Sequence, residues 1–174
     1  MLNLLAINNG VQHIVESLLN VTTIFEDQNA PRPEGDYLTL KLTSIQQLAR
    51  REEGATNDQG LASVFAHYLI TFSFNSFREN SKSLMEQLRF ALNLRTVLDQ
   101  FEALGLGFSN TTPIIDVPML LQTEWEERSQ MNAMFFVSDT DQDNIGFIQS
   151  TDIDGKFYNA DGSLEKEVTL DIQT

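Results

Sequence analysis

The sequence of 174 residues contains no cysteine. This absence excludes disulfide bonds, thiolate metal sites and cysteine nucleophiles. It is compatible with folding in a reducing cytosol but does not establish that location. Histidine is nearly absent as well: only His13 and His67 are present, and no Ser-His-Asp or two-histidine metal spacing surrounds either one. Structural roles are therefore the simpler interpretation of both histidines.

Basic residues are scarce, with 11 Lys and Arg against 25 Asp and Glu and a net charge of −14. Such a surface repels the phosphate backbone, so a nucleic-acid-binding protein is not expected. Two interpretations of the charge stay open. It either keeps the protein soluble and free of unwanted contacts, or it forms an acidic wall along which DNA slides without sticking.

The chain also lacks long apolar runs and is poor in structure breakers, with 4 Pro and 9 Gly. The apolar start at residues 1–7 is short, has no basic flank and soon meets Asn8-Asn9-Gly10, so we expect neither a signal peptide nor a membrane span. Hydrophobic residues make up 41% of the chain and include 12 Phe, which is sufficient for a core. The length predicts one domain with at most a small appendage. We expect the domain to span residues 1–155 and a hairpin or contact arm to span residues 156–174.

Hydrophobic periodicity predicts the first elements. A helix is expected near residues 10–20, a short strand at 21–26 and a turn at 30–36. Residues 37–45 alternate as a half-buried strand with Leu38, Leu40 and Leu42 on one face. Residues 46–60 are polar and predict a long hairpin loop or protruding arm, and residues 61–77 form the longest clear strand.

The second half begins with helical segments at 84–92 and 96–104, the latter ended by Gly105. Extended structure is expected at 108–122, a strand at 124–137, a turn at 139–144 and a returning strand at 145–148. A hairpin over 156–172 turns at Asp161-Gly162. The predicted fold is α+β: a two-layer sandwich of a mostly antiparallel or mixed sheet with helices on one face, plus a C-terminal β-hairpin.

Two acidic patterns were weighed as metal or catalytic sites. Asp139-x-Asp141-x-Asp143 starts like an EF-hand loop, but Asn144 and Ser150 stand where that loop needs Gly and Glu, so a solvated turn is the simpler interpretation. Asp116, Glu124, Glu126 and Asp139 are the candidates for a metal-dependent hydrolase. No Lys, His or further carboxylate stands at a defined spacing to them, so we predict no catalytic residue, cofactor or metal site.

Arg50, Arg51, Glu52 and Glu53 lie together in the polar loop. Adjacent opposite charges are typical of a solvated loop. They also suit a subunit contact in which the arginines of one copy meet the acidic groups of another. Because basic residues are few, the arginine pair is a candidate interface.

Three segments resemble a known protein family. Residues 27–33 (Asp-Gln-Asn-Ala-Pro-Arg-Pro) and the strand 36–42 are similar to a Q-N-x-P-x-P turn and the strand after it. Residues 120–132 (Leu-Leu-Gln-Thr-Glu-Trp-Glu-Glu-Arg-Ser-Gln-Met-Asn) resemble the strand L-x-T-x-[YW]-E-x-R-A-Q-[ML]-D. Residues 143–148 (Asp-Asn-Ile-Gly-Phe-Ile) resemble D-x-[VI]-G-x-I. Over residues 24–155 the chain thus resembles the neck or tail-terminator proteins of tailed bacteriophages.

The chain departs from that pattern at three places. Gly35-Asp36 stands where the family often has Pro before Tyr, Ser129 replaces a usual Ala, and Asn132 replaces a usual Asp. The acidic segment after Gly155 has no counterpart, which is why it is expected to be a contact arm.

The resemblance implies a structural virion protein with a tail-terminator-like fold, not an enzyme, located at the head–tail junction and assembled in the host cytoplasm. Its copies would form a hexameric ring that caps the tail tube, stops tube growth and docks to the head-completion connector, with the sheath protein as a further partner. DNA would pass through without specific binding, and no membrane is involved.

A ring needs two unlike patches on each subunit. The candidates are the arm at 46–60 and the strand 124–132, the latter with Glu124, Trp125, Glu127, Arg128 and Gln130. Alternatives are a tail tube, sheath or head-completion subunit and, more remotely, the hydrolase.

Overall fold

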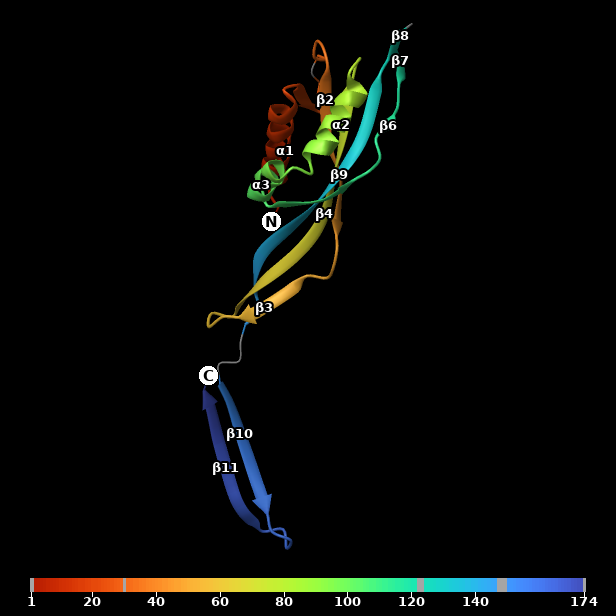
Figure 1. Ribbon diagram of the computed structural model, residues 1–174. Coiled ribbons are helices and arrows are strands. Elements are labelled where there is room, and N and C mark those ends of the chain that lie inside the picture. The colour runs from red at the N-terminus through yellow and green to blue at the C-terminus, as the bar shows by residue number, and fades with distance from the viewer. Residues whose placement is uncertain (1, 30, 122–123, 147–149, 174) are drawn as a thin grey trace. The chain divides into compact units, whose positions relative to one another are not determined.

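The computed structural model describes residues 2–29, 31–121, 124–146 and 150–173 (Figure 1). The chain divides into two compact units, the first made of Met1–Glu52 and Phe65–Thr140 and the second of Glu53–Val64 and Asp141–Thr174. The helices are α1 (Leu4–Leu19), α2 (Ser81–Ala91) and α3 (Arg95–Ala103). The strands are β1 (Thr22–Phe25), β2 (Tyr37–Gln47), β3 (Glu52–Thr56), β4 (Leu61–Phe77), β5 (Leu106–Thr111), β6 (Ile115–Asp116), β7 (Met119–Leu121), β8 (Glu124–Glu126), β9 (Arg128–Asn144), β10 (Ser150–Tyr158) and β11 (Leu164–Gln173).

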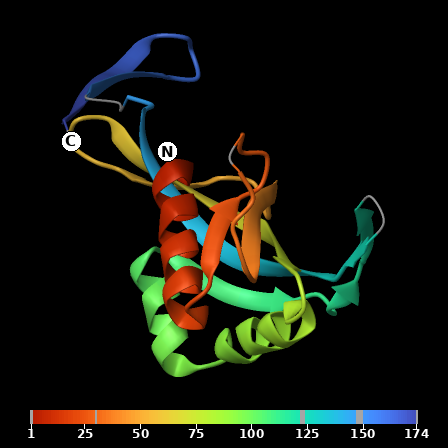
Figure 2. The same cartoon turned by 90° about the horizontal axis from the view of Figure 1, so that it is seen from above.

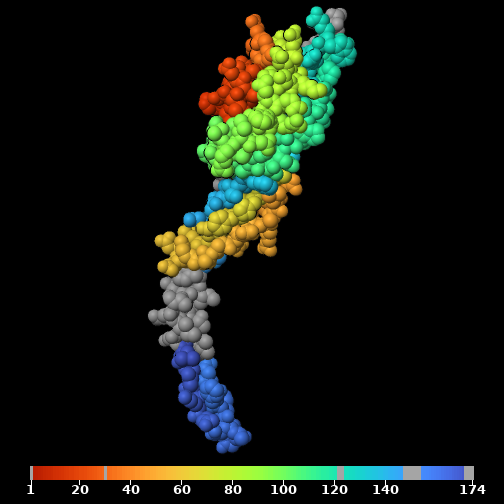
Figure 3. All heavy atoms as spheres, viewed as in Figure 1, coloured from red at the N-terminus to blue at the C-terminus, as the bar shows by residue number. Residues whose placement is uncertain are grey.

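The main sheet is mixed and runs in the order β1-β2-β4-β9-β5, with β3 added to β4 and β6 added to β9. β1 pairs with β2 in parallel, whereas the β2–β4, β5–β9 and β6–β9 pairs are antiparallel. All three helices lie against one face of this sheet (Figure 2) and form a continuous layer in the space-filling view (Figure 3). The predicted α+β class, with helices on one face, is confirmed. Among the described residues, none of the helices has the length and apolar character needed to cross a membrane.

The core lies between that helical layer and the sheet. Alternate residues of the central strands point into it because successive side chains of a strand face opposite ways. The largest fully buried side chains there include Leu38 and Leu40 of β2, Phe72 and Phe74 of β4, Phe135 of β9 and Phe101 of α3. The rings of Phe101 and Phe135 lie 4.9 Å apart and join the helical layer to the sheet.

Helix α1 begins at Leu4, well before the predicted start near residue 10. The Asn3 side chain accepts a hydrogen bond from the Ala6 amide at 3.1 Å and caps the helix. The polar run Asn8-Asn9-Gly10, expected to precede the helix, lies inside it. Gly10 fits there because the helix passes close to Leu104: an added Cβ would lie 2.6 Å from Leu104 Cδ1.

The first four residues of β2 are buried on both faces of the sheet, so the prediction of a half-buried strand is wrong for this part of the strand. Tyr37, Leu38, Thr39 and Leu40 are all buried. Leu38 and Leu40 face the core, while the Tyr37 ring stacks on Phe77 with centroids 4.7 Å apart. A second, smaller packed layer therefore covers this end of the sheet.

Strand β9 continues through Asn144, so the turn predicted at residues 139–144 is wrong. The acidic residues of this segment are extended and lack the loop conformation of an EF-hand. In the strand predicted at 145–148, Ile145 and Gly146 are not in a strand. Residues 147–148 lie outside the described residues.

The C-terminal hairpin is present, and β10 begins earlier than the strand predicted from residue 156. β10 and β11 pair antiparallel, with Asp154 opposite Thr169 and Lys156 opposite Glu167. Gly162 has a φ of +84° in the turn, a conformation that glycine adopts without strain. The Asp161 side chain accepts hydrogen bonds from the Ser163 amide at 2.9 Å and from the Ser163 hydroxyl at 2.6 Å. The latter bond is the largest cause of a lowered pKa of Asp161.

Candidate functional site

Three arginines surround the stacked rings of Tyr37 and Phe77 at one end of the main sheet. The guanidinium carbons of Arg32 and Arg128 lie 5.8 and 5.2 Å from the Phe77 centroid, and that of Arg78 lies 5.9 Å from the Tyr37 centroid. Cations within about 6 Å of an aromatic face are attracted by the ring quadrupole. We call these five residues the arginine–aromatic cluster. It gathers three of the few basic side chains of an acidic protein in one place.

Hydrogen bonds fix each arginine of the cluster. Arg32 pairs with Glu126 at 3.1 Å, and Arg128 donates to Asn75 Oδ1 at 2.9 Å. Arg78 donates to the Pro33 carbonyl at 2.9 Å. The cluster thus connects the segment before β2, the central strand β4 and the β8–β9 junction.

The backbone at Arg78 also shapes this end of the sheet. Its φ of +77° is uncommon for a residue with a side chain. The Arg78 amide donates to the Glu127 carbonyl at 2.9 Å, at the residue that separates β8 from β9. Burial raises the pKa of Tyr37, and the nearby Arg32 guanidinium opposes that shift.

An open pocket of about 970 Å³ lies beside the cluster. Its ionic lining contains Arg32 and Arg78 of the cluster together with Asp36, Glu79, Glu124, Glu126 and Glu127, so acidic groups outnumber basic ones. Trp125 also lines the pocket and is 70% exposed. We call this site the acidic pocket.

Most of the predicted interface residues of strand 124–132 gather at this end of the sheet. Glu124, Trp125 and Glu127 line the acidic pocket, and Arg128 belongs to the cluster. Gln130 lies on the sheet, where its amide donates to Ser73 Oγ at 3.2 Å. The structure brings the first four together and assigns Gln130 to strand pairing.

The other predicted patch lies at the opposite end of β2. Tyr37 pairs with Phe77, whereas Gln47 pairs with Tyr68, and Arg50 and Arg51 follow Gln47. At a rise of about 3.3 Å per residue, the strand separates these ends by about 33 Å. Arg50, Arg51, Glu52 and Glu53 are all exposed, and β3 begins at Glu52, so the predicted polar loop is partly a strand.

Of the four carboxylates considered for hydrolase chemistry, Glu124 and Glu126 line the acidic pocket, whereas Asp116 and Asp139 do not. Asp116 accepts a hydrogen bond from Ser129 Oγ at 2.9 Å and pairs with Lys82 at 3.3 Å, and these contacts lower the pKa of Asp116. Glu126 is paired with Arg32. Across the described ranges, no group of three or more histidine or acidic side chains could hold a metal ion.

The two histidines lie on separate elements. His13 is exposed on α1, and His67 on β4 has Nδ1 2.8 Å from Ser138 Oγ.

Sequence reasoning missed the apolar surface beside the pocket. In the β7–β8 hairpin, Leu120 lies opposite Trp125 and is 53% exposed. Met119 of the same hairpin and Ile115 of β6, which precedes it, are exposed as well. The residues leading to Leu120 were read only as extended structure, although apolar side chains on a short two-stranded ribbon signal an unfilled contact.

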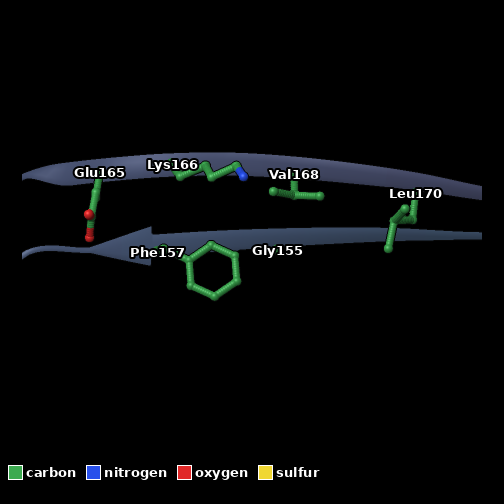
Figure 4. Close-up of a pocket in the computed structure, with 6 residues that line it drawn as sticks. All are labelled: Gly155, Phe157, Glu165, Lys166, Val168 and Leu170. Atoms are coloured by element: carbon green, nitrogen blue, oxygen red, sulfur yellow. The ribbon is translucent and has the colours of Figure 1, made fainter.

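One face of the C-terminal hairpin is polar, and the other is mainly apolar but also carries Lys166, which lies opposite Phe157. On the polar face, Lys156 pairs with Glu167 at 3.0 Å and Thr169 donates to Asp154 at 2.7 Å. Phe157, Val168 and Leu170 line a shallow groove on the hairpin (Figure 4). Phe157 is 57% exposed and Leu170 54%.

Comparison with known proteins identifies the family. The model of the family described as phage neck terminator protein matches residues 6–161, which is most of the chain. No curated protein matches the chain. The matched range contains the arginine–aromatic cluster, the acidic pocket and the exposed arginine loop. Membership implies a virion location and interaction with other virion proteins of the tail or head. The chain belongs to the phage neck terminator protein family and is a structural protein of the phage neck.

Proposed function

We propose that copies of this chain form a hexameric ring that caps the head-proximal end of the tail tube, stops tube growth and docks to the head-completion connector. The family match over residues 6–161 carries this proposal. The tail tube protein meets one face of the ring and the connector the other, with the sheath protein as a further partner. Assembly takes place in the host cytoplasm.

The subunit has the two unlike patches that a ring contact needs. A closed ring forms when one patch of each copy meets a different patch of the next around a rotation that closes. The exposed loop with Arg50 and Arg51 lies at one end of β2, and the pocket with Glu124, Trp125 and Glu127 lies at the other. This separation supports head-to-tail association of identical copies.

The charge of the chain supports DNA passage without retention. With a net charge of −14, a channel lined by these subunits repels phosphate groups. Mapping the charge of an assembled ring tests this part of the proposal. We expect an acidic channel wall, and a basic wall would contradict it.

Residues 156–174 act as a contact arm that follows the domain of residues 1–155 in the chain. The exposed apolar side chains of Phe157 and Leu170 support this role, because a two-stranded hairpin has too little buried surface to be stable alone. A tail or head protein of the same virion is the expected partner.

The direct test is a mass measurement of the purified chain, alone and with its tube protein, combined with electron microscopy. We expect a single closed ring that binds tube ends. Polymers without a length limit would instead identify a tube or sheath subunit. A chain that stays monomeric both at high concentration and in particles would overturn the ring.

Deletion of the arginine loop tests length control. Without Arg50 and Arg51 and their neighbours, we expect tails of irregular length and failed joining to heads. Normal tails and normal joining would remove the loop from the mechanism. Circular dichroism of the deletion variant confirms that the domain still folds.

A further inference from the structure

Arg50 and Arg51 are adjacent, exposed cations, and Glu52 and Glu53 follow them directly in the chain. The ion pairs of the described residues use Arg32, Lys41, Lys82, Arg89, Arg95, Arg128 and Lys156. Within the described ranges, neither Arg50 nor Arg51 forms an ion pair, although both are exposed. Their neighbour Glu52 begins β3 and pairs with neither of them. Two adjacent unpaired arginines stand out in a chain where most basic side chains are paired.

The acidic pocket has an excess of negative charge. Glu126 is neutralised by Arg32, whereas Glu79, Glu124 and Glu127 form no ion pair with any other described residue. All three are exposed at the pocket, next to the exposed ring of Trp125. Asp36 lines the pocket without an ion pair to a described residue as well, so the pocket presents four such carboxylates against one lining cation without an ion pair, Arg78, and it adds one aromatic face.

These opposite charges cannot meet within one copy. The strand β2 alone holds the two ends of the sheet about 33 Å apart. At physiological ionic strength exposed charges interact over only about 8 Å. Pairing of these two sites with each other therefore requires a second copy of the chain.

We propose that the Arg50–Arg51 loop of one copy docks into the acidic pocket of the next copy. A guanidinium matches a carboxylate through two parallel hydrogen bonds and also stacks on an aromatic face, so one arginine binds Glu124 or Glu127 while the other covers Trp125. The contact joins unlike patches, as a closed ring requires. It rests on the proposed ring and names the side chains that hold neighbouring copies together.

The absence of native cysteine permits a clean cross-linking test. Arg51→Cys and Glu124→Cys are introduced together and the assembled protein is oxidised. An intramolecular disulfide is excluded, because bridged Cα atoms lie within about 7 Å of each other. We expect a ladder of covalent multimers on a non-reducing gel. The control combines Arg51→Cys with Glu86→Cys, an exposed position on α2 away from the pocket. A ladder no stronger than that of the control would overturn the contact.

Charge reversal provides a second, independent measurement. Arg50→Glu with Arg51→Glu, and separately Glu124→Arg with Glu127→Arg, should each weaken self-association at least tenfold in sedimentation velocity. All four changes in one chain should restore it, because both patches then carry reversed but complementary charges. Arg89→Glu with Arg95→Glu is the control for the charge change alone. Equal loss in this control, or no rescue in the fourfold variant, would overturn the contact.

These results separate the two proposals. Wild-type rings that are insensitive to both pairs of substitutions would disprove the docking of the arginine loop and leave the ring intact. A wild-type chain that forms no oligomer, alone or on tubes, would disprove the ring itself.

Discussion

The sandwich of helices and main sheet and the C-terminal hairpin use similar strands with opposite outcomes. In the sandwich, Phe72 and Phe135 are completely buried beneath the helices. In the hairpin, Phe157 is 57% exposed. Both regions alternate polar and apolar residues, so alternation alone does not determine burial. The second layer does, and in the sandwich the helices supply it.

The hairpin shows what a strand pair achieves without that layer. Its polar face is held by the Lys156–Glu167 ion pair and the Thr169–Asp154 hydrogen bond. Exposed contacts of this kind contribute little to stability. Its apolar groove has no comparable support, so we expect a partner in the virion to supply the missing layer.

The largest expected difference between the two regions is the effect of removing a phenyl ring. Phe72→Ala leaves a cavity in the core and should lower the free energy of unfolding by about 3–5 kcal/mol. The matched variant Phe157→Ala should change it by no more than about 0.5 kcal/mol in the isolated chain. Urea denaturation followed by circular dichroism measures both values. Similar losses would show that the hairpin is packed in solution and would break the comparison.

A smaller difference in the free energy of unfolding is expected when a hydroxyl group is removed from each region. Ser76 is buried and donates to the Ser81 carbonyl at 2.6 Å. Ser76→Ala removes a hydrogen-bond donor from that carbonyl, so we expect a destabilisation of about 1–2 kcal/mol. Ser163→Ala, which removes an exposed hydroxyl from the hairpin turn, should cost no more than about 0.5 kcal/mol. An equal cost for the two serines would mean that burial does not set the strength of these hydrogen bonds.

The smallest expected effect is a change in the pKa of an aspartate, and it should be similar in the sandwich and in the hairpin. Hydroxyl hydrogen bonds from Ser129 and Ser163 are the largest causes of the lowered pKa values of Asp116 and Asp161, whose ordinary value is 3.8. Each carboxylate therefore stabilises the fold above that pH, and the contribution is lost as the pH falls through the lowered pKa. Ser129→Ala and Ser163→Ala should each raise the pKa of the partner aspartate, as measured by NMR titration. An unchanged pKa in either variant would show that the hydroxyl is not the cause.

The elements whose pattern is local could be predicted from the sequence. The alternation of Leu38, Leu40 and Leu42 predicts the strand at residues 37–45, and the alternation over residues 61–77 predicts the longest strand, because a strand displays its period directly. The apolar stripes of the helices and the end of the last helix at Gly105 could be predicted as well, because both are local patterns. The fold class followed from the order of these elements.

Features set by distant contacts could not be predicted. Asn8-Asn9-Gly10 looks like a helix breaker, yet Gly10 is the residue that allows close packing on Leu104. The acidic run at the end of β9 has no apolar alternation and is extended because it continues a paired strand. Both cases depend on neighbours far away in the sequence.

The candidate site was predicted only in part. The segment with Glu124, Trp125, Glu127 and Arg128 was found from a motif. The roles of Arg32 and Arg78 were not predicted. Their contacts with Tyr37 and Phe77 depend on strand pairing and on the backbone conformation at Arg78. No local pattern connects these positions.

Trp125 is the only tryptophan of the chain, and it lies exposed at the rim of the acidic pocket. Its indole emission is therefore a built-in optical probe of this one surface. Covering the ring should move the emission maximum to shorter wavelength and protect it from quenching by iodide. If the proposed contact forms there, its assembly can be followed in real time without attaching a dye.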